Sequence, residues 1–392
     1  MEDQKRIRSG IVGAGFAATI HMKAIRRLGG VDVECVGVYA EDWAEDFAAE
    51  WGVDVFDRLD ELLDEVDLIH VCTPPVAHET IARQALERDK CAVVEKPLTG
   101  YFGDGSPDFN GDTFDKQDAL DHALASIKRM LEAEEDSEGQ ILYAENWVYA
   151  PAVQKEREIL EKTGGQLLWM HGEESHSGSH AETYAYWKYS GGGVMIGKGV
   201  HPLGAALYMK QVEGRTRNGE PIRPASVSAH THAITRLPDF RDEGHLRCDY
   251  HDIEDFSGMH VVFEDGTAAD IFAHDIVMGG IHNWIEVCAN NHRTICNINP
   301  NNAMQTYNPV EENFSDIYVV EKIGTKQGWS QPCPDEHWFT GYTQEAEDFY
   351  RCAATGERPQ SDSRLAADCI STIYSAYVSA QEDSRLVDVT TL

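Results

Sequence analysis

Short apolar runs alternate with amphipathic stretches through the first hundred residues. The runs are rich in Val and Ile, as strands buried on both faces are. The stretches between them repeat apolar residues every three or four positions, which is typical of helices packed on one side. The predicted strands are 7–12, 33–39, 67–72 and 91–95, and the predicted helices are 16–28, 42–51, 59–66 and 78–88. Strands that alternate with helices indicate a parallel sheet covered on both faces.

The pattern changes after residue 100. Residues 101–115 are rich in Gly, Asp and Asn, and residues 116–135 have helical periodicity, so we interpret 101–139 as an insertion. A strand at 141–145 and a helix that opens at Pro151 follow. Beyond residue 164, strands joined by short turns predict an antiparallel sheet. The strands predicted there are 167–173, 225–236, 259–263, 268–274, 284–289, 294–298 and 317–323, and helices return at 342–352 and 363–381.

The composition excludes several classes of function. The 392 residues include 33 Lys and Arg against 67 Asp and Glu, a formal net charge of −34. Nucleic acids and anionic membranes bind basic surfaces, so we expect neither as a partner. Nine cysteines, an odd number without a CxxC pair, favour reduced thiols over a disulfide framework. The first eight residues are polar and no long apolar run occurs, so we expect a cytoplasmic protein without a signal peptide or membrane span.

A glycine-rich turn lies between the first predicted strand and the first predicted helix. Gly13 permits the tight turn, Gly15 lets the backbone approach a pyrophosphate, and Ala18 lets the helix pack closely on the strand. The helix N-terminus offers unpaired N–H groups to the phosphates. This GxGxxA pattern, in its strand–turn–helix context, predicts a dinucleotide site. The expected cofactor contacts here are Gly13, Gly15, Phe16, Ala17 and Ala18.

The end of the second strand bears on the choice of dinucleotide. It reads Val-Tyr-Ala-Glu-Asp over 38–42, and the next basic residue is Arg58. Carboxylates favour ribose hydroxyls over a 2′-phosphate, so NAD is preferred to NADP, with Tyr39 and Glu41 as cofactor contacts. The alternative, that Glu41 and Asp42 only begin the next helix, fits the pattern equally well.

Three further motifs follow in order along the chain. They are TPPVAH at 73–78, EKP at 95–97 and GGGVMIGKGVHP at 191–202. Together with the glycine-rich turn, they resemble the glucose–fructose oxidoreductase and inositol dehydrogenase family, often written Gfo/Idh/MocA. The resemblance covers nearly the whole chain apart from 101–139.

The resemblance implies a fold, an activity and an assembly. The fold is α/β, with an N-terminal Rossmann doubly wound parallel sheet (1–145) and an α+β domain with a large open, mostly antiparallel sheet (146–341). C-terminal helices (342–392) pack back between the domains. The activity is NAD(P)-dependent hydride transfer between a nicotinamide cofactor and a hydroxyl or keto group of a sugar, cyclitol, polyol or glycoside. The assembly is a homodimer or homotetramer, often joined through the open sheet.

The same resemblance implies two catalytic residues. Lys96 of the EKP motif lies between nicotinamide and substrate, and His201 contacts the reacting hydroxyl. Their chemistry fits, because alcohol oxidation needs acid–base groups and an imidazole titrates near neutrality. We expect burial beside a cationic nicotinamide to lower the pKa of Lys96. Further expected cofactor contacts are Thr73, Pro74, His78, Glu95 and Asn146, and further substrate contacts are Trp147, Tyr149, His176, Trp187 and Lys198.

Some of these positions have a second interpretation. His78 could equally cap its helix, and each aromatic residue could equally belong to an ordinary core. The family carries an aspartate four residues before the histidine, whereas this chain has Gly197, followed by Lys198. Either His201 and Lys96 suffice, or Lys198 or another carboxylate compensates, or the reaction differs. A cationic Lys198 would disfavour a cationic His201.

The missing aspartate keeps two alternative functions open. One is an oxidation–elimination glycosidase that regenerates its bound NAD, and the other is a non-catalytic regulator that senses NAD or a sugar. We expect no metal, because a metal site needs three or four converging ligands and the histidines near His176 are separated by Gly and Ser.

Overall fold

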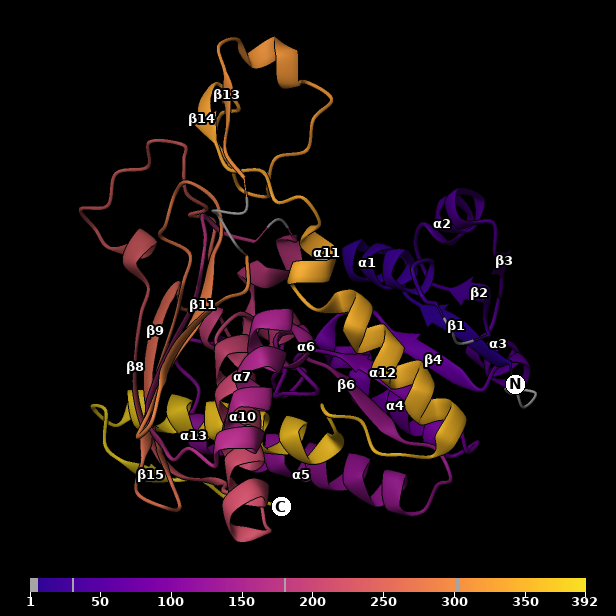
Figure 1. Cartoon of the computed structure of the whole chain (residues 1–392), viewed down its shortest axis with the longest axis horizontal. Coiled ribbons are helices and arrows are strands. Elements are labelled where there is room, and N and C mark those ends of the chain that lie inside the picture. Colours follow the sequence, from indigo (N-terminus) through magenta and orange to yellow (C-terminus); the bar gives the residue numbers. More distant parts are fainter. Residues whose placement is uncertain (1–5, 30–31, 180, 300–303) are drawn as a thin grey trace.

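The first of two sheets is parallel and lies in the N-terminal half of the chain. The computed structural model describes residues 6–29, 32–179, 181–299 and 304–392 (Figure 1). The six strands lie in the order β3-β2-β1-β4-β5-β6. The strands are β1 (Ile7–Val12), β2 (Val33–Tyr39), β3 (Asp54–Val55), β4 (Leu68–Val71), β5 (Cys91–Glu95) and β6 (Ile141–Ala144). The helices around them are α1 (Phe16–Ile25), α2 (Ala44–Trp51), α3 (Leu59–Glu65), α4 (His78–Leu86) and α5 (Lys116–Glu135). The order reverses between β1 and β4, which opens a crevice at their carboxyl ends.

The segment 101–139 comprises a loop and a helix. α5 connects β5 to β6, and these two strands pair in parallel. A parallel pair needs a crossover connection, usually a helix, and α5 supplies it. The loop 101–115 precedes this helix and ends where the Asp115 side chain accepts a hydrogen bond of 3.0 Å from the backbone N–H of Gln117 and caps α5.

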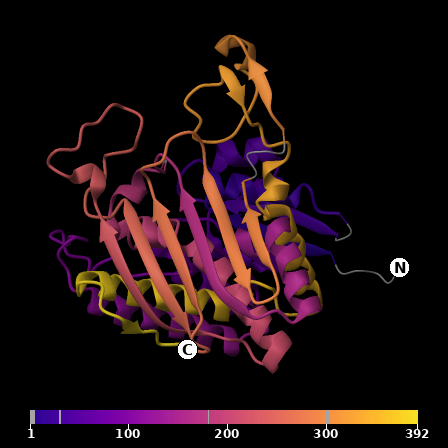
Figure 2. The ribbon, with the colours of Figure 1, turned by 60° about the vertical axis from the view of Figure 1, so that its left-hand side comes forward.

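The second sheet has seven strands in the order β12-β11-β7-β10-β9-β8-β15. Its pairs are antiparallel except for β7 with β10. Helices lie against one face only, and Figure 2 shows the other face uncovered. The strands are β7 (Leu167–Ser175), β8 (Pro224–His232), β9 (Phe256–Phe263), β10 (Ala268–His274), β11 (His282–Ala289), β12 (Arg293–Asn297) and β15 (Val387–Asp388). The predicted fold class, a Rossmann-type sheet followed by a large, mostly antiparallel sheet, is confirmed.

Helices fill the space between the sheets (Figure 1). α10 packs against β7, β10 and β11, α12 against α1, and α13 against both α5 and β8. α13 also carries Tyr374, whose hydroxyl accepts a hydrogen bond from the N–H of Tyr101 and donates one to the carbonyl of Gly191, both at 2.7 Å. The helices here are α6 (Asn146–Tyr149), α7 (Pro151–Thr163), α8 (Trp187–Ser190), α9 (Val194–Gly197), α10 (Val200–Asn218), α11 (Glu336–Phe339), α12 (Tyr342–Thr355) and α13 (Ser363–Gln381). Single 3₁₀ turns occur at Pro75–Ala77, Glu182–Ala185, Ile234–Arg236 and Glu311–Phe314.

One predicted strand is wrong. Residues 317–323 lie in the segment between two short strands, β13 (Thr306–Asn308) and β14 (Gly328–Ser330), which pair with each other. The side chains of Ile317 and Tyr318 are 46% and 57% exposed, and Val319 is buried. A β-branched run becomes a strand only where a neighbouring edge accepts its backbone hydrogen bonds, and here the two flanking strands use each other's edges.

Two expectations from the composition concern thiols and membranes. The nine cysteines form no disulfide, and all nine lie within the described residues. None of the helices in the described ranges combines the length and the apolar character needed to cross a bilayer.

Candidate functional site

The glycine-rich turn between β1 and α1 is shaped for close backbone approach. Gly13 has φ +100°, and a Cβ there would lie 2.6 Å from the carbonyl oxygen of Cys72. No atom of the described structure lies within 4 Å of a Cβ built on Gly15, so that side of the turn is open. Ala18 is fully buried against the sheet, and Phe16, at the start of α1, is 69% exposed. The geometry therefore offers the N-terminus of α1 to an anionic group.

The end of β2 lies beside this turn. The N–H of Gly13 donates a hydrogen bond of 2.8 Å to the carbonyl of Tyr39. Glu41 and Asp42 are exposed and precede α2, which begins at Ala44. Neither acid is a residue of the helix, so both carboxylates remain available at the edge of the crevice.

Lys96 connects two of the sequence motifs. It follows β5, and its Nζ donates a hydrogen bond of 2.9 Å to the carbonyl of Gly197, at the end of α9. The peptide bond between Lys96 and Pro97 is cis. The EKP motif and the glycine-rich GGGVMIGKGVHP motif, about a hundred residues apart in sequence, therefore meet at one place.

Glu95 anchors this strand end rather than projecting into the crevice. Its Oε2 accepts a hydrogen bond of 3.0 Å from the N–H of Lys96, and its Oε1 lies 2.9 Å from Nε2 of His21 on α1. The Nδ1 of His21 in turn lies 2.7 Å from Nδ1 of His70. Burial lowers the pKa of His21, but Cys72 and Glu95 outweigh it and raise that pKa well above its usual value. Burial and the neighbouring His21 lower the pKa of His70. Both shifts favour a proton on His21 over one on His70.

His201 lies in the first turn of α10 between two glutamates. Its Nδ1 is 2.7 Å from Oε1 of Glu145, which follows β6 and is fully buried. Its Nε2 is 3.8 Å from Oε2 of Glu174, the penultimate residue of β7. The ring of Trp147 stacks on the imidazole with 5.9 Å between centroids. Both ring nitrogens therefore face carboxylates that come from the ends of strands.

These glutamates answer the question raised by the missing aspartate. A Cβ on Gly197 would lie 3.3 Å from the ring of Tyr184, so that ring fills the space that a side chain at position 197 would need. The carboxylate charge comes instead from Glu145 and Glu174. Sequence reasoning named neither residue, although Glu145 is the last residue of the strand predicted over 141–145 and Glu174 directly follows the strand predicted over 167–173.

Lys198 is neutralised by its own partner. Its Nζ donates to Oδ1 of Asp275, and the hydroxyl of Tyr250 donates to the other oxygen of that carboxylate. His176 is nearby, with Nδ1 at 3.5 Å from Oδ1 of Asp275. A shallow pocket beside this group is lined in part by Ser179, Tyr184, Lys198, Tyr250 and Asp275. The structure thus brings Lys198 and His176 together at one end of the site.

The charges around Lys96 and His201 raise the pKa of both side chains, whereas the sequence led us to expect lower values. Burial alone lowers the pKa of Lys96, but Tyr184, Glu174, Glu95 and Glu145 outweigh it and raise that pKa. Burial also lowers the pKa of His201, and Glu145 and Glu174 again outweigh it and raise the value. The expected lowering of the Lys96 pKa is therefore absent in the free protein. The expected repulsion by Lys198 does not prevail either, because Asp275 pairs with it.

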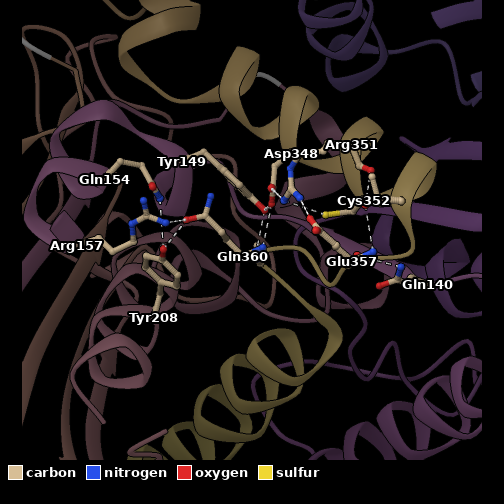
Figure 3. A network of polar contacts seen from close by, with 12 residues as sticks. Gln140, Tyr149, Gln154, Arg157, Tyr208, Asp348, Arg351, Cys352, Glu357 and Gln360 are labelled. Atoms are coloured by element: carbon tan, nitrogen blue, oxygen red, sulfur yellow. Dashed lines mark hydrogen bonds and ion pairs between the residues drawn. The ribbon is translucent and has the colours of Figure 1, made fainter. Parts of the chain in front are cut away.

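Four predicted contact residues have other partners. Tyr149 donates a hydrogen bond of 2.9 Å to Asp348 and accepts one from the N–H of Ser361, within a polar network that reaches α12 (Figure 3). Trp187 is buried, and its Nε1 donates to the carbonyl of Tyr101. The Asn146 amide donates a hydrogen bond to the carbonyl of Thr340. The two ring nitrogens of His78 lie 2.9 and 3.0 Å from the carbonyl oxygens of Pro97 and Thr73. His78 therefore joins the TPPVAH turn, with Thr73 and Pro74, to the EKP turn.

The possible metal ligands among the described residues are spread out. Within the described ranges, no three His, Cys, Asp or Glu side chains are grouped so that they could hold a metal ion. The site is built from lysine, histidine and carboxylate side chains and from an open helix N-terminus.

Comparisons with known proteins agree with this geometry. A family model described as "Oxidoreductase family, NAD-binding Rossmann fold" (GFO_IDH_MocA) matches residues 7–106. The chain is 36% identical over 91 residues to glucose-6-phosphate 3-dehydrogenase of Bacillus subtilis, which is 23% of this chain and 25% of that protein. It is 32% identical over 105 residues to inositol 2-dehydrogenase of Rhodococcus erythropolis, 25% of this chain and 30% of that protein. The match thus spans a quarter to three tenths of these curated relatives.

Solved structures extend the similarity to the whole fold. GenD2 from gentamicin A biosynthesis, solved in complex with NAD, has a TM-score of 0.77 at 22% identity and covers 98% of this chain and 97% of its own. Levoglucosan dehydrogenase, solved with NADH and levoglucosan, has a TM-score of 0.73 at 17% identity and covers 99% of this chain and 100% of its own. Residues 7–106 thus match the NAD-binding Rossmann domain of the Gfo/Idh/MocA oxidoreductase family, and the whole chain shares the fold of these solved dehydrogenase structures.

Proposed function

We propose that the protein is an NAD-dependent oxidoreductase that acts on a hydroxyl or keto group of a sugar, cyclitol or related polyol. The observation that carries this proposal is the contact between Lys96, at the carboxyl end of β5, and the carbonyl of Gly197 in the motif that contains His201. The His201 ring itself lies between Glu145 and Glu174. Open parallel sheets bind ligands at this edge. The relatives' names, which are those of sugar and inositol dehydrogenases, point to the same chemistry.

The residues present fit a dinucleotide. A Cβ on Gly13 would collide with the carbonyl of Cys72, and the space over Gly15 is open, so the turn can hold a pyrophosphate against the N-terminus of α1. The exposed Glu41 at the end of β2 suits a ribose with free hydroxyls, and the next basic residue along the chain, Arg58, donates to Asp60. NAD is therefore proposed rather than NADP. When bound, it supplies the hydride acceptor or donor.

The side chains of the site bind and polarise the reacting hydroxyl. The Nζ of Lys96 is fixed by the carbonyl of Gly197 and keeps two further protons for a substrate oxygen. The Nε2 of His201 is directed away from Glu145, because Nδ1 makes that contact. The surrounding carboxylates raise the pKa of both groups in the free protein, which favours the forms that stabilise negative charge on the substrate oxygen.

The proposal extends to assembly and location. A homodimer or homotetramer is proposed to form through the uncovered face of the second sheet, where Trp169 and Ile295 are 37% and 53% exposed. Trp169→Asp should then lower the mass measured by sedimentation, whereas an unchanged mass would rule out this face. A cytoplasmic location, with the cysteines reduced, is part of the same proposal.

The experiment that tests the activity uses the purified protein, NAD and a panel of sugars, cyclitols and polyols. We expect at least one panel member to produce NADH absorbance, and Lys96→Ala to abolish it. Lys128→Ala, an exposed lysine on α5, is the matched control and should change nothing. The proposal fails if no panel member is oxidised or if Lys96→Ala retains full activity. Glycoside cleavage without net NADH would indicate the oxidation–elimination reaction instead, and binding without turnover would indicate a regulator.

A further inference from the structure

The shallow pocket beside Lys198 adjoins the proposed reaction centre. It is lined in part by Gly197, Lys198 and Asp275. The carbonyl of Gly197 accepts the hydrogen bond from Lys96, and the N–H of His201 donates one of 3.0 Å to the carbonyl of Lys198. A substrate whose reacting hydroxyl contacts Lys96 and His201 therefore has this pocket within reach of its other groups.

Asp275 is the carboxylate that lines this pocket, and both of its oxygens are bonded. Lys198 donates a hydrogen bond to Oδ1, and the hydroxyl of Tyr250 donates one to Oδ2. The residue is 2% exposed. The negative charge of Asp275 is therefore offset by Lys198, and Asp275 does not repel an anion as an unpaired carboxylate would.

Arg247 brings a second cation to the pocket from the loop between β8 and β9. Its guanidinium lies over the ring of Tyr250, 5.2 Å from the ring centroid. Its Nη1 donates hydrogen bonds of 2.8 Å to the carbonyls of Ser179 and Ala181, and Ser179 lines the pocket. The partner of its Nε is Asp249, whose side chain is 64% exposed, so solvent screens that carboxylate more than it screens the buried guanidinium.

Lys322 belongs to the segment between β13 and β14, which projects beyond the second sheet in Figure 1. Residues 319–323 of this segment are buried or half-buried, whereas the flanking residues 315–318 and 324–325 are exposed. Val320 Cγ2 would lie 3.9 Å from a Cβ on Gly280, in the loop that begins at Asp275. The part of the segment that holds Lys322 therefore packs on the loop that supplies the pocket carboxylate.

The backbone of Lys322 is held in an unusual conformation. Its φ is +59°, in the left-handed region that disfavours residues with a Cβ. Residues in such conformations persist where the surrounding structure fixes them, and they are frequent at ligand sites. The next residue but one is Gly324, so a flexible residue is available nearby and the strained position is nevertheless a lysine.

The ammonium group of Lys322 has no partner of its own. Among the described residues, no hydrogen bond or ion pair involves its Nζ. Burial lowers the pKa of Lys322, and the nearby Lys198 and Arg247 lower it further. Glu321 and Asp275 act in the opposite direction but do not outweigh them. A half-buried lysine beside two other cations is stabilised by an anion that contacts all three.

We propose that this pocket binds an anionic group of the substrate, a phosphate or a carboxylate, and that Lys322 selects for it. The proposal rests on the proposed oxidoreductase function and deepens it, because it names the substrate class: sugars or cyclitols that carry such a group close to the reacting hydroxyl. Lys198, Arg247 and Lys322 come from three separate segments of a chain with a formal net charge of −34. Cations that converge in so acidic a protein attract an anionic ligand to one place on its surface.

The kinetic test compares substrates that differ only in the anionic group. The pairs are glucose with glucose 6-phosphate, glucose with glucuronate, and myo-inositol with its monophosphate. For at least one pair, the kcat/KM of the wild type should be higher for the anionic member by about tenfold or more. The phosphate and carboxylate pairs together show which group the pocket takes. A neutral member that is oxidised as well as or better than its anionic partner in every pair would overturn the proposal.

Three variants test the role of Lys322. Lys322→Met keeps the length of the side chain and removes the charge, so KM for the anionic member should rise by about tenfold while kcat, and KM for the neutral member, stay within about twofold. Lys322→Arg keeps a cation and should recover most of the affinity. Lys128→Met removes a lysine from the exposed surface of α5 and should change neither constant. An equal change for both members in Lys322→Met, or no change, would contradict the assignment.

A binding measurement separates this proposal from the proposed function. Inorganic phosphate and acetate are the probes, titrated with saturating NAD so that the glycine-rich turn is occupied. At least one probe should bind Lys322→Met about tenfold more weakly than the wild type, and Lys128→Met should bind it as the wild type does. If no substrate is oxidised but probe binding depends on Lys322, the oxidoreductase proposal fails and the anion site stands. Equal binding by the wild type and Lys322→Met would overturn the anion site whatever the activity.

Discussion

The Nδ1 atom of His201 lies 2.7 Å from Oε1 of Glu145, a residue 56 positions earlier in the chain. A strand end and a helix start thereby form one pair, and the carboxylate is fully buried. The aspartate expected from the family resemblance is replaced by Gly197, and the carboxylate beside the imidazole comes from the end of β6. The pair holds the ring in one orientation and favours its cationic form.

Glu145→Gln tests this pair. Glutamine keeps an oxygen for Nδ1–H but removes the negative charge, so the pKa of His201 should fall and the kcat–pH profile should shift to lower pH. We expect kcat at neutral pH to fall by about 10- to 100-fold. Glu156→Gln is the control, because Glu156 is an equally buried glutamate 2.7 Å from His292, outside the site. A profile that does not move in Glu145→Gln would contradict the assignment.

The glycine-rich turn permits a test that separates folding from cofactor binding. Gly15→Ala places its Cβ in open space, so the melting temperature without NAD should stay within about 2 °C of the wild-type value. Its Kd for NAD should rise by tenfold or more, because the methyl group occupies the approach of the pyrophosphate. Gly13→Ala should instead lower the melting temperature without NAD, since its φ is +100° and its Cβ would lie 2.6 Å from Cys72. Equal effects of the two variants on both measurements would argue against this division of roles.

Tyr149→Phe distinguishes a structural residue from a substrate contact. The variant removes the hydroxyl that donates to Asp348 and accepts from Ser361, so the free energy of unfolding should fall by about 1 to 2 kcal/mol (Figure 3). The kcat/KM of the folded variant should equal that of the wild type. Urea unfolding and steady-state kinetics are the measurements, and a raised KM with unchanged stability would return Tyr149 to the substrate site.

A bidentate ion pair between α4 and α5 predicts a pH-dependent contribution to stability. Glu79 accepts from Nε and Nη2 of Arg129 at 2.6 and 2.8 Å and from the hydroxyl of Ser126. Burial raises the pKa of Glu79, but these donors outweigh it and the net pKa is lowered. A lowered folded-state pKa adds stability above the unfolded pKa, and that stability is lost as the pH falls through the folded value. Glu79→Gln should therefore be less stable by about 1 kcal/mol at pH 7, since Arg129 is half exposed.

The control for that measurement is the same pair of proteins at acid pH. Below the folded-state pKa of Glu79, the side chain at position 79 is neutral in both proteins. The wild type and Glu79→Gln should then have the same free energy of unfolding. A difference that persists at acid pH would show that the glutamine acts through packing and not through charge.

Most of the first sheet could be predicted from the sequence. The central strands β4 and β5 are buried, apolar runs, and the predicted bounds of β1, β2 and β5 match the structure. The two-residue strand β3, which is exposed, was not predicted. Residues 317–323 have a similar composition but no free strand edge beside them, and the sequence carries no sign of that. Local pattern therefore identifies a strand only where the fold provides a partner.

The sequence predicted those residues of the site that lie within recognisable motifs, and it did not predict the others. Lys96 and His201 stand in recognisable patterns, and the structure brings their motifs together. Glu145 and Glu174 depend on which strand ends lie beside α10, a long-range property that periodicity does not contain. Tyr149 illustrates the converse, because its nearness to a motif in sequence says nothing about the direction of its ring.

Tyr374, the α13 residue that bonds both the 101 loop and the Gly191 loop, has a mechanical consequence. This one side chain forms hydrogen bonds with a loop from each half of the molecule. One turn further along the same helix, the hydroxyl of Tyr377 donates a hydrogen bond to Glu254. The two halves of the molecule cannot move apart at these loops without breaking the hydrogen bonds of Tyr374. Any movement that separates the two loops must break these hydrogen bonds, each of which contributes about 1 kcal/mol, so Tyr374 favours one fixed arrangement of the two loops.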